Sequence, residues 1–413
     1  MKKIITFLGI YPKETQYEFQ GQTYTGQVFA EAMYQFLDFD EMLVFTTEDA
    51  EKNTLPILTA LVDDRIKSVS IPDGKDAQEM WQIFDELTNV VEDGDSVIFD
   101  ITHGLRSLPF LVFLAAAFLK SAKNVNIEAI YYGAFELSKQ NDGKAPVIEM
   151  SQFVSLLDWL NASDQFIQTG NAAGLVEQIR AARPAWQPQS DKATHEKSRQ
   201  IRQAADSLES VSRALRLILP DQAMGEIEKL QATLNSASAS VEEYAPPFSV
   251  LAQKVLSAYM PLALPNPRAP ENIVASLNRE KELICWYLDH KQIVQAVAIA
   301  REWLVSWGVV HAGYIDLYNK SIRKEIEEAF GRANDQKKKQ RGSFEDFSFS
   351  SGVHLRDLPD VNKTLKLYEQ LGDMRNTLLH AGKRPSSDPA ETLERNICCL
   401  CRQLVTLPLP ESH

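Results

Sequence analysis

The sequence has few cysteines and no excess of positive charge. It holds 4 cysteines in 413 residues, three of them between Cys398 and Cys401. No Cys-x2-Cys pair is matched by a second pair or by a histidine pair, so we expect neither a metal site nor structural disulfides. The net charge of −13 excludes a uniformly basic coat for nucleic acid, although a local basic site remains compatible with it.

Long apolar runs and the common nucleotide-binding fingerprints are also absent. The longest apolar run, Leu108 to Leu119, is too short to span a bilayer, and no small-residue cleavage site follows the first apolar run. We therefore expect a cytoplasmic protein with no membrane partner. No G-x-G-x-x-G follows the first predicted strand and no G-K-S/T occurs, which excludes a dinucleotide fingerprint and a P-loop.

The acidity is concentrated in the first third of the chain. Residues 1–150 hold 12 Lys and Arg against 24 Asp and Glu, whereas the rest holds 31 against 32. Such asymmetry indicates two parts with different partners.

The hydrophobic patterns predict an α/β part followed by an all-α part. Residues 1–150 alternate strand and helix patterns, which predicts a parallel-rich sheet with helices on both faces. From residue 151 onward only helical periodicity is present, and the proline-rich stretch 264–271 indicates a linker. We therefore expect a Rossmann-like domain over 1–150, a helical connector over 151–270 and a helical bundle over 271–413. The expected strands are 3–10, 41–47, 66–71, 95–102 and 126–133, and the first expected helix is 25–37.

The segment from Asp100 to Ser107 directly follows a predicted strand and suits a phosphate or a ribose. It offers hydroxyls, a ring donor, one cation and a glycine that permits close backbone approach, at Thr102, Ser107, His103, Arg106 and Gly104. A helix that begins near Ser107 adds free N–H groups and the positive end of its dipole. The alternative is an ordinary turn in which Asp100 or Thr102 only caps the helix and His103 packs.

Other strand ends are expected to line the same crevice, because the carboxyl ends of parallel strands meet at one edge of a sheet. The candidates are Gly9, Tyr11, Thr46 and Gly133. Each of them alone is also compatible with an ordinary turn.

The helix expected over 362–379 ends in a second group of reactive residues, Arg375, Asn376 and His380. Asn376 lies one turn before His380, whereas Arg375 shares a helix face with His380 only loosely. An imidazole can take a proton from a ribose 2′-hydroxyl or give one to the leaving 5′-oxygen, and an arginine can stabilise the phosphorane charge. The group therefore suits metal-independent RNA cleavage. The alternative is a solvated helix end capped by Gly382.

Two further charged groups remain open in their interpretation. Arg301 and Glu302, on an earlier helix, either order the active arginine or only cover the bundle surface. The polar stretch 333–343 is expected to be a loop, and its basic residues Lys337, Lys338, Lys339 and Arg341 either are solvated or attract an RNA backbone.

The two groups of reactive residues together resemble a known family. Asp100-Ile-Thr-His-Gly104 resembles the DxTHG motif of the CRISPR-associated DxTHG family, ancillary proteins of type III CRISPR systems. Arg375-Asn-x-x-x-His380 matches the Arg-x4–6-His motif of HEPN ribonucleases. The resemblance is strongest in residues 1–150 and about 281–400. It implies a CARF sensor domain, a helical connector and a C-terminal HEPN domain.

The resemblance also implies an activity. Such proteins are similar to ribonucleases of antiviral defence that are activated by cyclic oligoadenylate. In these ribonucleases the ligand binds across a dimer of CARF domains and allosterically activates a composite site between two HEPN domains, which cleaves single-stranded RNA. Asp100, Thr102, His103 and Gly104 would then bind the ligand. Arg375 and His380 would be the catalytic pair, supported by Asn376, with no cofactor. A single pair per chain demands a homodimer or a higher oligomer.

Several choices remain open at this point. Cyclic tetra-adenylate is the expected activator and cyclic hexa-adenylate the second choice. Thr102 or Ser107 would position a ribose hydroxyl if the sensor also cleaved its own ligand. The alternatives are a non-catalytic sensor or transcriptional regulator, and a nucleotide hydrolase on the sheet alone. Because residues 1–150 are acidic, we expect backbone N–H groups, hydroxyls and Arg106 to hold the phosphates.

Overall fold

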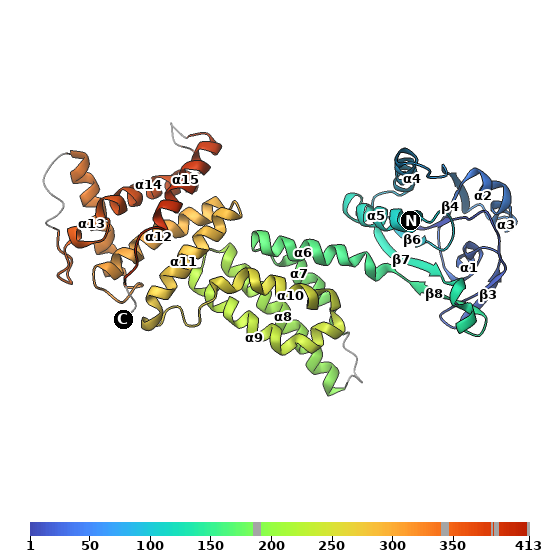
Figure 1. The fold of residues 1–413 in the computed structure, drawn as a ribbon, viewed down its shortest axis with the longest axis horizontal. Helices are drawn as coiled ribbons and strands as arrows, with labels where there is room; N and C mark the ends of the chain where they lie inside the picture. Colours follow the sequence, from blue (N-terminus) through green and yellow to red (C-terminus); the bar gives the residue numbers. More distant parts are fainter. Residues whose placement is uncertain (185–190, 340–346, 381–382, 384–387, 411–413) are drawn as a thin grey trace. The chain divides into compact units, whose positions relative to one another are not determined.

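The computed structural model describes residues 1–184, 191–339, 347–380, 383 and 388–410. The chain divides into two compact units, Met1–Asp158 and Trp159–His413 (Figure 1). The first unit is α/β and the second is helical, so the expected fold class is confirmed. A further division of the helical unit near residue 270 stays a prediction.

The first unit is built on a sheet that, among the described residues, has eight strands in the order β3-β2-β8-β7-β6-β1-β4-β5. Strands β5, β4, β1, β6 and β7 run parallel, so their carboxyl ends share one edge. The chain adds β4 and β5 on one side of β1 and β6 and β7 on the other, so the strand order reverses at β1 and β6. The strands are β1 (Lys2–Phe7), β2 (Thr15–Phe19), β3 (Gln22–Gly26), β4 (Glu41–Thr46), β5 (Ile66–Ser70), β6 (Ser96–Asp100), β7 (Asn126–Gly133) and β8 (Lys144–Glu149).

Three strands were missed by the sequence patterns. β2 and β3 form an antiparallel hairpin, β2 pairs in parallel with β8, and β8 runs antiparallel to β7, so the sheet is mixed. The helix expected over 25–37 is wrong in its first part, because residues 25 and 26 end β3 and the helix covers Phe29–Phe36. β2 escaped detection because Tyr17 is its only fully buried side chain, which leaves no apolar run to recognise.

Helices cover both faces of the sheet, as expected. Along β1, Ile5 and Phe7 point into one apolar cluster and Ile4 points into another, which follows the alternation of side chains along a strand. The helices of this unit are α1 (Phe29–Phe36), α2 (Glu48–Asn53), α3 (Leu55–Thr59), α4 (Ala77–Asn89) and α5 (Leu108–Ala122).

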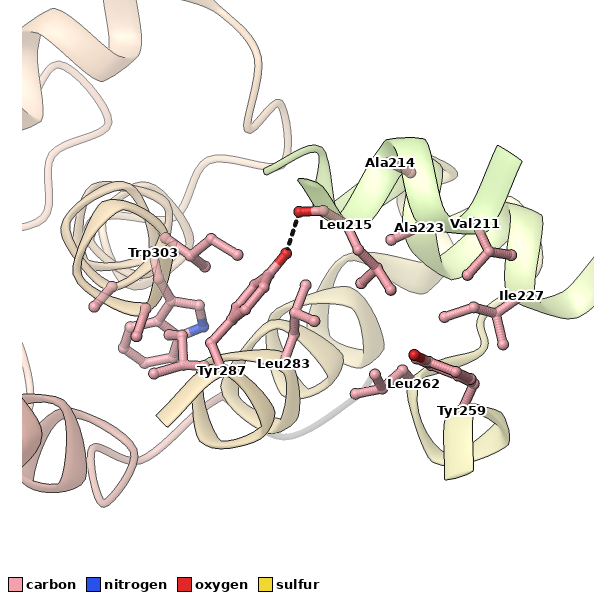
Figure 2. Packing of buried hydrophobic residues seen from close by; sticks show 14 of the residues in the cluster. Val211, Ala214, Leu215, Ala223, Ile227, Tyr259, Leu262, Leu283, Tyr287 and Trp303 are labelled. Carbon is pink, nitrogen blue, oxygen red and sulfur yellow. Dashed lines mark hydrogen bonds between the residues drawn. The ribbon is translucent and has the colours of Figure 1, made fainter. Parts of the chain in front are cut away.

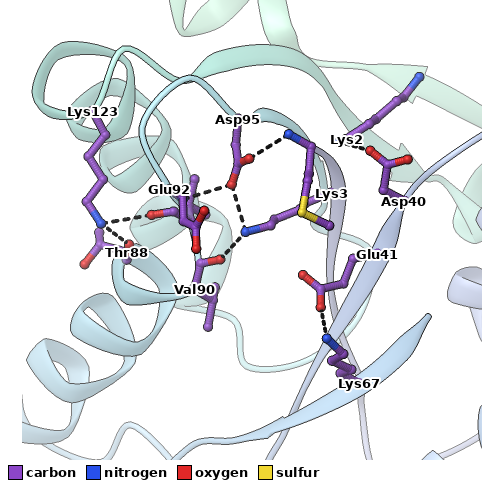
Figure 3. A network of polar contacts seen from close by, with 12 residues as sticks. Lys2, Lys3, Asp40, Glu41, Lys67, Thr88, Val90, Glu92, Asp95 and Lys123 are labelled. Atoms are coloured by element: carbon purple, nitrogen blue, oxygen red, sulfur yellow. Dashed lines mark hydrogen bonds and ion pairs between the residues drawn. The ribbon is translucent and has the colours of Figure 1, made fainter. Parts of the chain in front are cut away.

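Buried polar contacts fix the amino-terminal edge of the sheet (Figure 3). The ammonium of Lys3 lies 2.8 Å from Asp95 Oδ2 and donates to the carbonyl of Val90 at 2.8 Å. Burial alone would raise the pKa of Asp95, but the contacts from Lys3 and from the Glu92 N–H lower it to about 2. This edge is therefore held by charge, and it lies opposite the edge where the predicted ligand loop begins.

The second unit has one apolar core that includes both the connector and the C-terminal helices (Figure 2). The hydroxyl of Tyr287 donates to the carbonyl of Leu215 at 2.6 Å, and Trp303 Nε1 donates to the carbonyl of Leu277 at 2.8 Å. The helices are α6 (Ser155–Thr169, which begins in the first unit), α7 (Ala173–Ala181), α8 (Lys192–Arg216), α9 (Pro220–Tyr244), α10 (Pro246–Tyr259), α11 (Ile273–Asp289), α12 (Ile293–His311), α13 (Lys320–Lys339), α14 (Val361–Leu379) and α15 (Ala390–Leu404).

Two helices of this unit differ from the sequence-based expectation. α12 is long and apolar enough to span a membrane by length and composition, but most of its residues are buried inside the unit. α13 runs to Lys339, so the loop expected over 333–343 is wrong for residues 333–339. The helix continues because Ala333 and Asn334 are buried, and Asn334 donates to a carbonyl of α14 at 2.9 Å. Arg341 lies outside the described residues.

Candidate functional site

The loop after β6 is tied to both neighbouring strands. Asp100 is fully buried, and its Oδ2 accepts from the Thr6 hydroxyl of β1 at 2.6 Å. Its Oδ1 accepts from the backbone N–H of Thr102 at 2.7 Å. Thr102 Oγ1 in turn accepts from the backbone N–H of Gly133, at the end of β7, at 2.8 Å. Asp100 and Thr102 therefore fix the course of the loop.

Glycine is required at the centre of this loop. Gly104 has φ +98°, and a Cβ there would lie 2.8 Å from Leu108 Cδ1 and 3.1 Å from Phe7 Cβ. A Cβ on Gly9, in the loop after β1, would lie 3.6 Å from the nitrogen of Gly104. The two loops are thus side by side where the strand order reverses, which is the place where open α/β sheets bind ligands.

His103 is held between the loop and β2. Its Nε2 lies 3.5 Å from the hydroxyl of Tyr17. Burial lowers the pKa of His103, against the opposing effect of the Asp100 charge, and burial raises the pKa of Asp100. His103 is consequently neutral at neutral pH. Because Nε2 lies next to the Tyr17 hydroxyl, one ring nitrogen, Nδ1, is left for a ligand.

Arg106, Ser107 and Tyr11 are the members of the predicted group whose side chains are exposed. Tyr11 is 83% exposed, and within the described residues the side chains of Arg106 and Ser107 have no hydrogen-bond or ion-pair partner. These side chains are available to a ligand that lies over the loop.

Thr46 and Gly133 lie beneath the site surface. A Cβ on Gly133 would lie 2.9 Å from Phe29 Cδ2, so this position supports the loop through its backbone N–H. Thr46 is fully buried, and its hydroxyl has no partner among the described residues. Neither residue is placed to touch a ligand without movement of the side chains around it.

A cavity of about 330 Å³ opens beside Gly9 and Gly104. Apolar side chains from β1, β4 and the start of α5 form its walls, and Asp49 and Asp73 are polar lining residues. Sequence reasoning missed both aspartates. The signal that could have found them is their position, because each follows a strand that ends at this edge, β4 or β5.

The second predicted group lies at the carboxyl end of α14. Arg375 Nη1 lies 3.4 Å from Glu302 Oε1 on α12, and Arg375 Nε is buried without a partner among the described residues. His380 is exposed and ends the helix, with its backbone N–H donating to the carbonyl of Asn376 at 3.0 Å. Gly382, the expected cap, lies outside the described residues.

Within one chain, Arg375 and His380 do not face each other. Five residues on an α-helix place two side chains about 140° apart around the axis. Arg375 lies against α12, whereas the imidazole of His380 is exposed and has no hydrogen-bond partner in the described structure. One chain therefore presents the two groups separately.

The two neighbouring residues on α12 have different roles. Glu302 contacts Arg375, and its Oε2 also accepts from Arg323 Nη2 at 2.8 Å. Arg301 lies over the ring of Tyr368, 3.9 Å from its centroid, and donates to the Tyr368 hydroxyl at 2.6 Å. The contacts therefore fit the interpretation that Glu302 orders Arg375, whose catalytic role stays a prediction. Sequence reasoning singled out neither Arg323 nor Tyr368.

The site contains no evident metal cage. Among the described residues, no group of three or more His, Cys, Asp or Glu side chains is arranged to hold a metal ion.

Comparisons with known proteins match two segments of the chain. A family model for the CARF domain of the CRISPR system endoribonuclease Csx1 matches residues 3–136, and one for the second domain of CRISPR-associated protein MJ1674 matches residues 155–260. MJ1674 of Methanocaldococcus jannaschii is 35% identical over 102 residues, which are 24% of this chain and 16% of that protein. Enterococcus italicus Csm6 bound to cyclic hexa-2'-fluoro-hexa-dAMP aligns over 98% of this chain and 93% of its own, with 10% identity and a TM-score of 0.37.

The sheet order and the loop after β6 thus belong to a CARF domain. These matches support a CRISPR ancillary protein that contains a CARF domain, in agreement with the resemblance carried by residues 100–104. The matched family models end at residue 260, so the HEPN assignment of residues 271–413 stays a prediction.

Proposed function

We propose that this protein acts in the cytoplasm as a cyclic oligoadenylate-activated ribonuclease of type III CRISPR antiviral defence. The observation that carries the proposal is a combination of two features in one chain. The chain contains a CARF domain with its loop after β6, and it contains Arg375 and His380, which do not face each other within that chain. Ligand binding to a CARF dimer shifts the helical half toward a geometry that cleaves single-stranded RNA.

The sensor half suits a ligand with phosphates and riboses without the help of a basic patch. The loops at Gly9 and Gly104 let a ligand approach the backbone closely, while Arg106 and Ser107 are free to bind it. His103, neutral at neutral pH, adds a hydrogen bond without adding charge. Cyclic tetra-adenylate is the first activator that we propose, and cyclic hexa-adenylate is the second.

A homodimer is supported by an exposed apolar face that begins three residues after the ligand loop. On α5, Phe110 is 70% exposed and Leu114 and Phe118 are also exposed, at a spacing of four residues that places them on one stripe. Trp81 of α4 continues the face through its contact with Phe84, whose ring meets Phe118. Pairing of this face about a two-fold axis would bring two ligand loops together, as a cyclic ligand with repeated units requires.

The same symmetry would complete the catalytic site. Leu379 lies between Asn376 and His380 and is 63% exposed, which suits contact with a second α14. His380 would move the proton of a ribose 2′-hydroxyl and Arg375 would stabilise the phosphorane charge, which leaves a 2′,3′-cyclic phosphate. Both groups act without a metal.

A fluorogenic RNA assay in EDTA, with and without cyclic tetra- and hexa-adenylate, tests the proposal. We expect cleavage that depends on one ring size and is lost in His380→Ala. Absence of stimulated cleavage with both rings, or full activity of His380→Ala, would overturn it. Ligand binding together with specific DNA binding and no cleavage would instead identify a non-catalytic sensor or regulator. Chromatography of the activator in the same reaction shows whether the sensor consumes it.

A further inference from the structure

Three cations of the first unit differ from the others in having no acceptor within the protein. Residues 1–150 hold 12 Lys and Arg, of which eight form an ion pair with a carboxylate and Lys123 donates to two backbone carbonyls. Lys13, Arg106 and Lys139 are exposed, and within the described structure their side chains have neither a hydrogen bond nor an ion pair. Because the same residues include 24 Asp and Glu, carboxylates are plentiful, and the lack of a partner at these three positions is selective.

The three cations share one edge of the sheet. Lys13 lies in the loop after β1, Arg106 in the loop after β6 and Lys139 in η1 (Phe135–Gln140), the short helix after β7. β1, β6 and β7 run parallel, so all three segments follow the carboxyl ends of strands, where open α/β sheets bind ligands. Cations that the protein leaves without a carboxylate at this edge are available to an anionic ligand.

Lys13 is held beside the loop after β6 by an aromatic ring. Its ammonium lies 4.6 Å from the centroid of the Phe135 ring, and its backbone N–H donates to the carbonyl of Gln27 at 2.9 Å. Phe135 is 39% exposed, and it lies two residues after Gly133, whose N–H donates to Thr102 of the loop. The pair of Lys13 and Phe135 therefore joins the loop after β1 to the turn after β7, next to the loop after β6.

We propose that Lys13 and Phe135 bind one phosphate and one adenine of the activator, the ammonium moving from the ring to the phosphate while the ring stacks on the base. The inference rests on the proposed activation by cyclic oligoadenylate and deepens it. The exchange is favourable because a charge-assisted hydrogen bond from an ammonium to a phosphate oxygen is stronger than a cation–π contact at an exposed site. The base takes the place of the ammonium over the ring, since every base offers a π-face to an aromatic side chain. The pair thus adds to Arg106 a second cation, from a different loop.

The test is calorimetry of the full-length protein with cyclic tetra- and hexa-adenylate. Lys13→Met removes the charge and keeps an unbranched side chain, and it should weaken binding of the preferred ring about 10-fold or more because a charge-assisted contact is lost. Phe135→Leu should weaken binding to a similar extent, whereas Phe135→Tyr should keep the wild-type affinity because its ring can still stack. Lys67→Met is the matched control, since Lys67 is also exposed but forms an ion pair with Glu41 at the opposite edge of the sheet.

A double variant separates contact with the phosphate from support of the ring. If Lys13 only held the Phe135 ring in place, Lys13→Met would have no further effect in the Phe135→Leu background. We expect instead that Lys13→Met still weakens binding in that background, because the ammonium contacts the phosphate directly. The absence of any further effect would overturn the exchange.

The remaining outcomes separate this inference from the proposed function. If the wild-type protein binds a ring and Lys13→Met binds it equally well, or if Lys67→Met loses as much affinity as Lys13→Met, the inference is wrong and the proposed function stands. If the wild-type protein binds neither ring, the proposed activators are wrong, and titration with adenosine 5′-monophosphate decides, because this nucleotide carries one base and one phosphate. Tighter binding by the wild-type protein than by Lys13→Met supports the pair, and equal binding overturns it.

Discussion

The ligand loop of the CARF domain and the carboxyl end of α14 are built in opposite ways. In the loop, Asp100 accepts two hydrogen bonds and Thr102 a third, and Gly104 has a backbone conformation that its neighbours require. At the end of α14, Arg375 has one contact at 3.4 Å and His380 is exposed. A buried, fully bonded polar network fixes a single geometry, whereas exposed side chains leave several open.

The difference indicates where regulation enters. A binding site that must recognise a ligand before anything else happens gains affinity from being formed in advance. A nuclease that must stay inactive without its signal gains from having its reactive groups apart. Each chain thus forms its half of the proposed sensor site in advance, whereas under the proposed function the Arg375–His380 pair would be completed by a second subunit.

The largest expected effect comes from removing the proposed catalytic groups at the end of α14. His380→Ala should lower activated RNA cleavage by about 10²–10⁴-fold, the usual contribution of a positioned proton-transfer group. Arg375→Ala should lower it by about 10²–10³-fold, the usual contribution of a group that stabilises charge in the transition state. Thermal unfolding of His380→Ala should match that of the wild-type protein because the imidazole is exposed and has no hydrogen-bond partner in the described structure.

Co-expression of these two variants tests whether the pair forms between subunits. A mixed dimer contains one intact arginine and one intact histidine on different chains. We expect part of the wild-type activity to return, measured in the same RNA assay. A mixed dimer that is as inactive as either parent would contradict a site shared between subunits.

The next effect is on stability, and it should appear in the loop alone. Asp100→Asn replaces an oxygen that accepts from Thr6 or from Thr102 with an amide that cannot accept. The free energy of unfolding should fall by about 1–3 kcal/mol, measured by urea denaturation. Asn376→Ala, at the end of α14, should change it by no more than about 0.5 kcal/mol. Equal losses in the two variants would remove the contrast between the two regions.

Alanine variants of two glycines, Gly104 and Gly143, distinguish the effect of backbone strain from the effect of lost contact with the ligand. Gly104→Ala introduces a Cβ at 2.8 Å from Leu108 Cδ1, whereas a Cβ on Gly143, which also has positive φ at +85°, would meet nothing within 4 Å in the described structure. Backbone strain of about 1–3 kcal/mol is expected in both variants. Calorimetry should show roughly 10-fold weaker activator binding for Gly104→Ala, since about 1.4 kcal/mol is tenfold. A similar loss for Gly143→Ala would show that the loop has no special role.

The sequence patterns found the parts of the fold that depend on local apolar runs. β1, β4, β6 and β7 each contain such a run, and their parallel order correctly placed Gly9 and Gly104 at one edge of the sheet. The hairpin of β2 and β3 was missed because its residues are mostly polar and Tyr17 is its one fully buried side chain other than hydrogen. Local pattern cannot reveal burial that a distant strand provides.

The same limit applies to the sites. Sequence reasoning grouped Asp100 with the ligand-binding residues, yet the structure occupies both of its oxygens with Thr6 and Thr102. It did not single out Arg323, because the contact of this side chain with Glu302 joins α13 to α12. Residue type and spacing could predict which side chains are reactive. Whether such a side chain is free to bind a ligand depends on its contacts with residues distant in sequence, which the pattern does not contain.

The smallest expected effect concerns the charge of His103 in the ligand loop. Burial lowers the pKa of His103 below its ordinary value near 6.5, so the ring is neutral at pH 7 and gains a proton only on the acid side of that value. The positive charge would then lie near the phosphates of the activator and strengthen binding as the pH falls. We expect calorimetric affinity to be constant between about pH 7 and 8 and to rise a few-fold near pH 5.5.

His103→Gln keeps a hydrogen-bonding group and removes the titration, so this variant should bind with one affinity across the whole range. Protonation should also destabilise the fold, because the unfolded chain binds the proton more readily than the native loop does. Stability should therefore decline below about pH 6.5 in the wild-type protein, and this decline should be weaker in His103→Gln. If the affinity of the wild-type protein fell on acidification, a charged His103 would not face the phosphates, and Arg106 would be left as the cation of the loop.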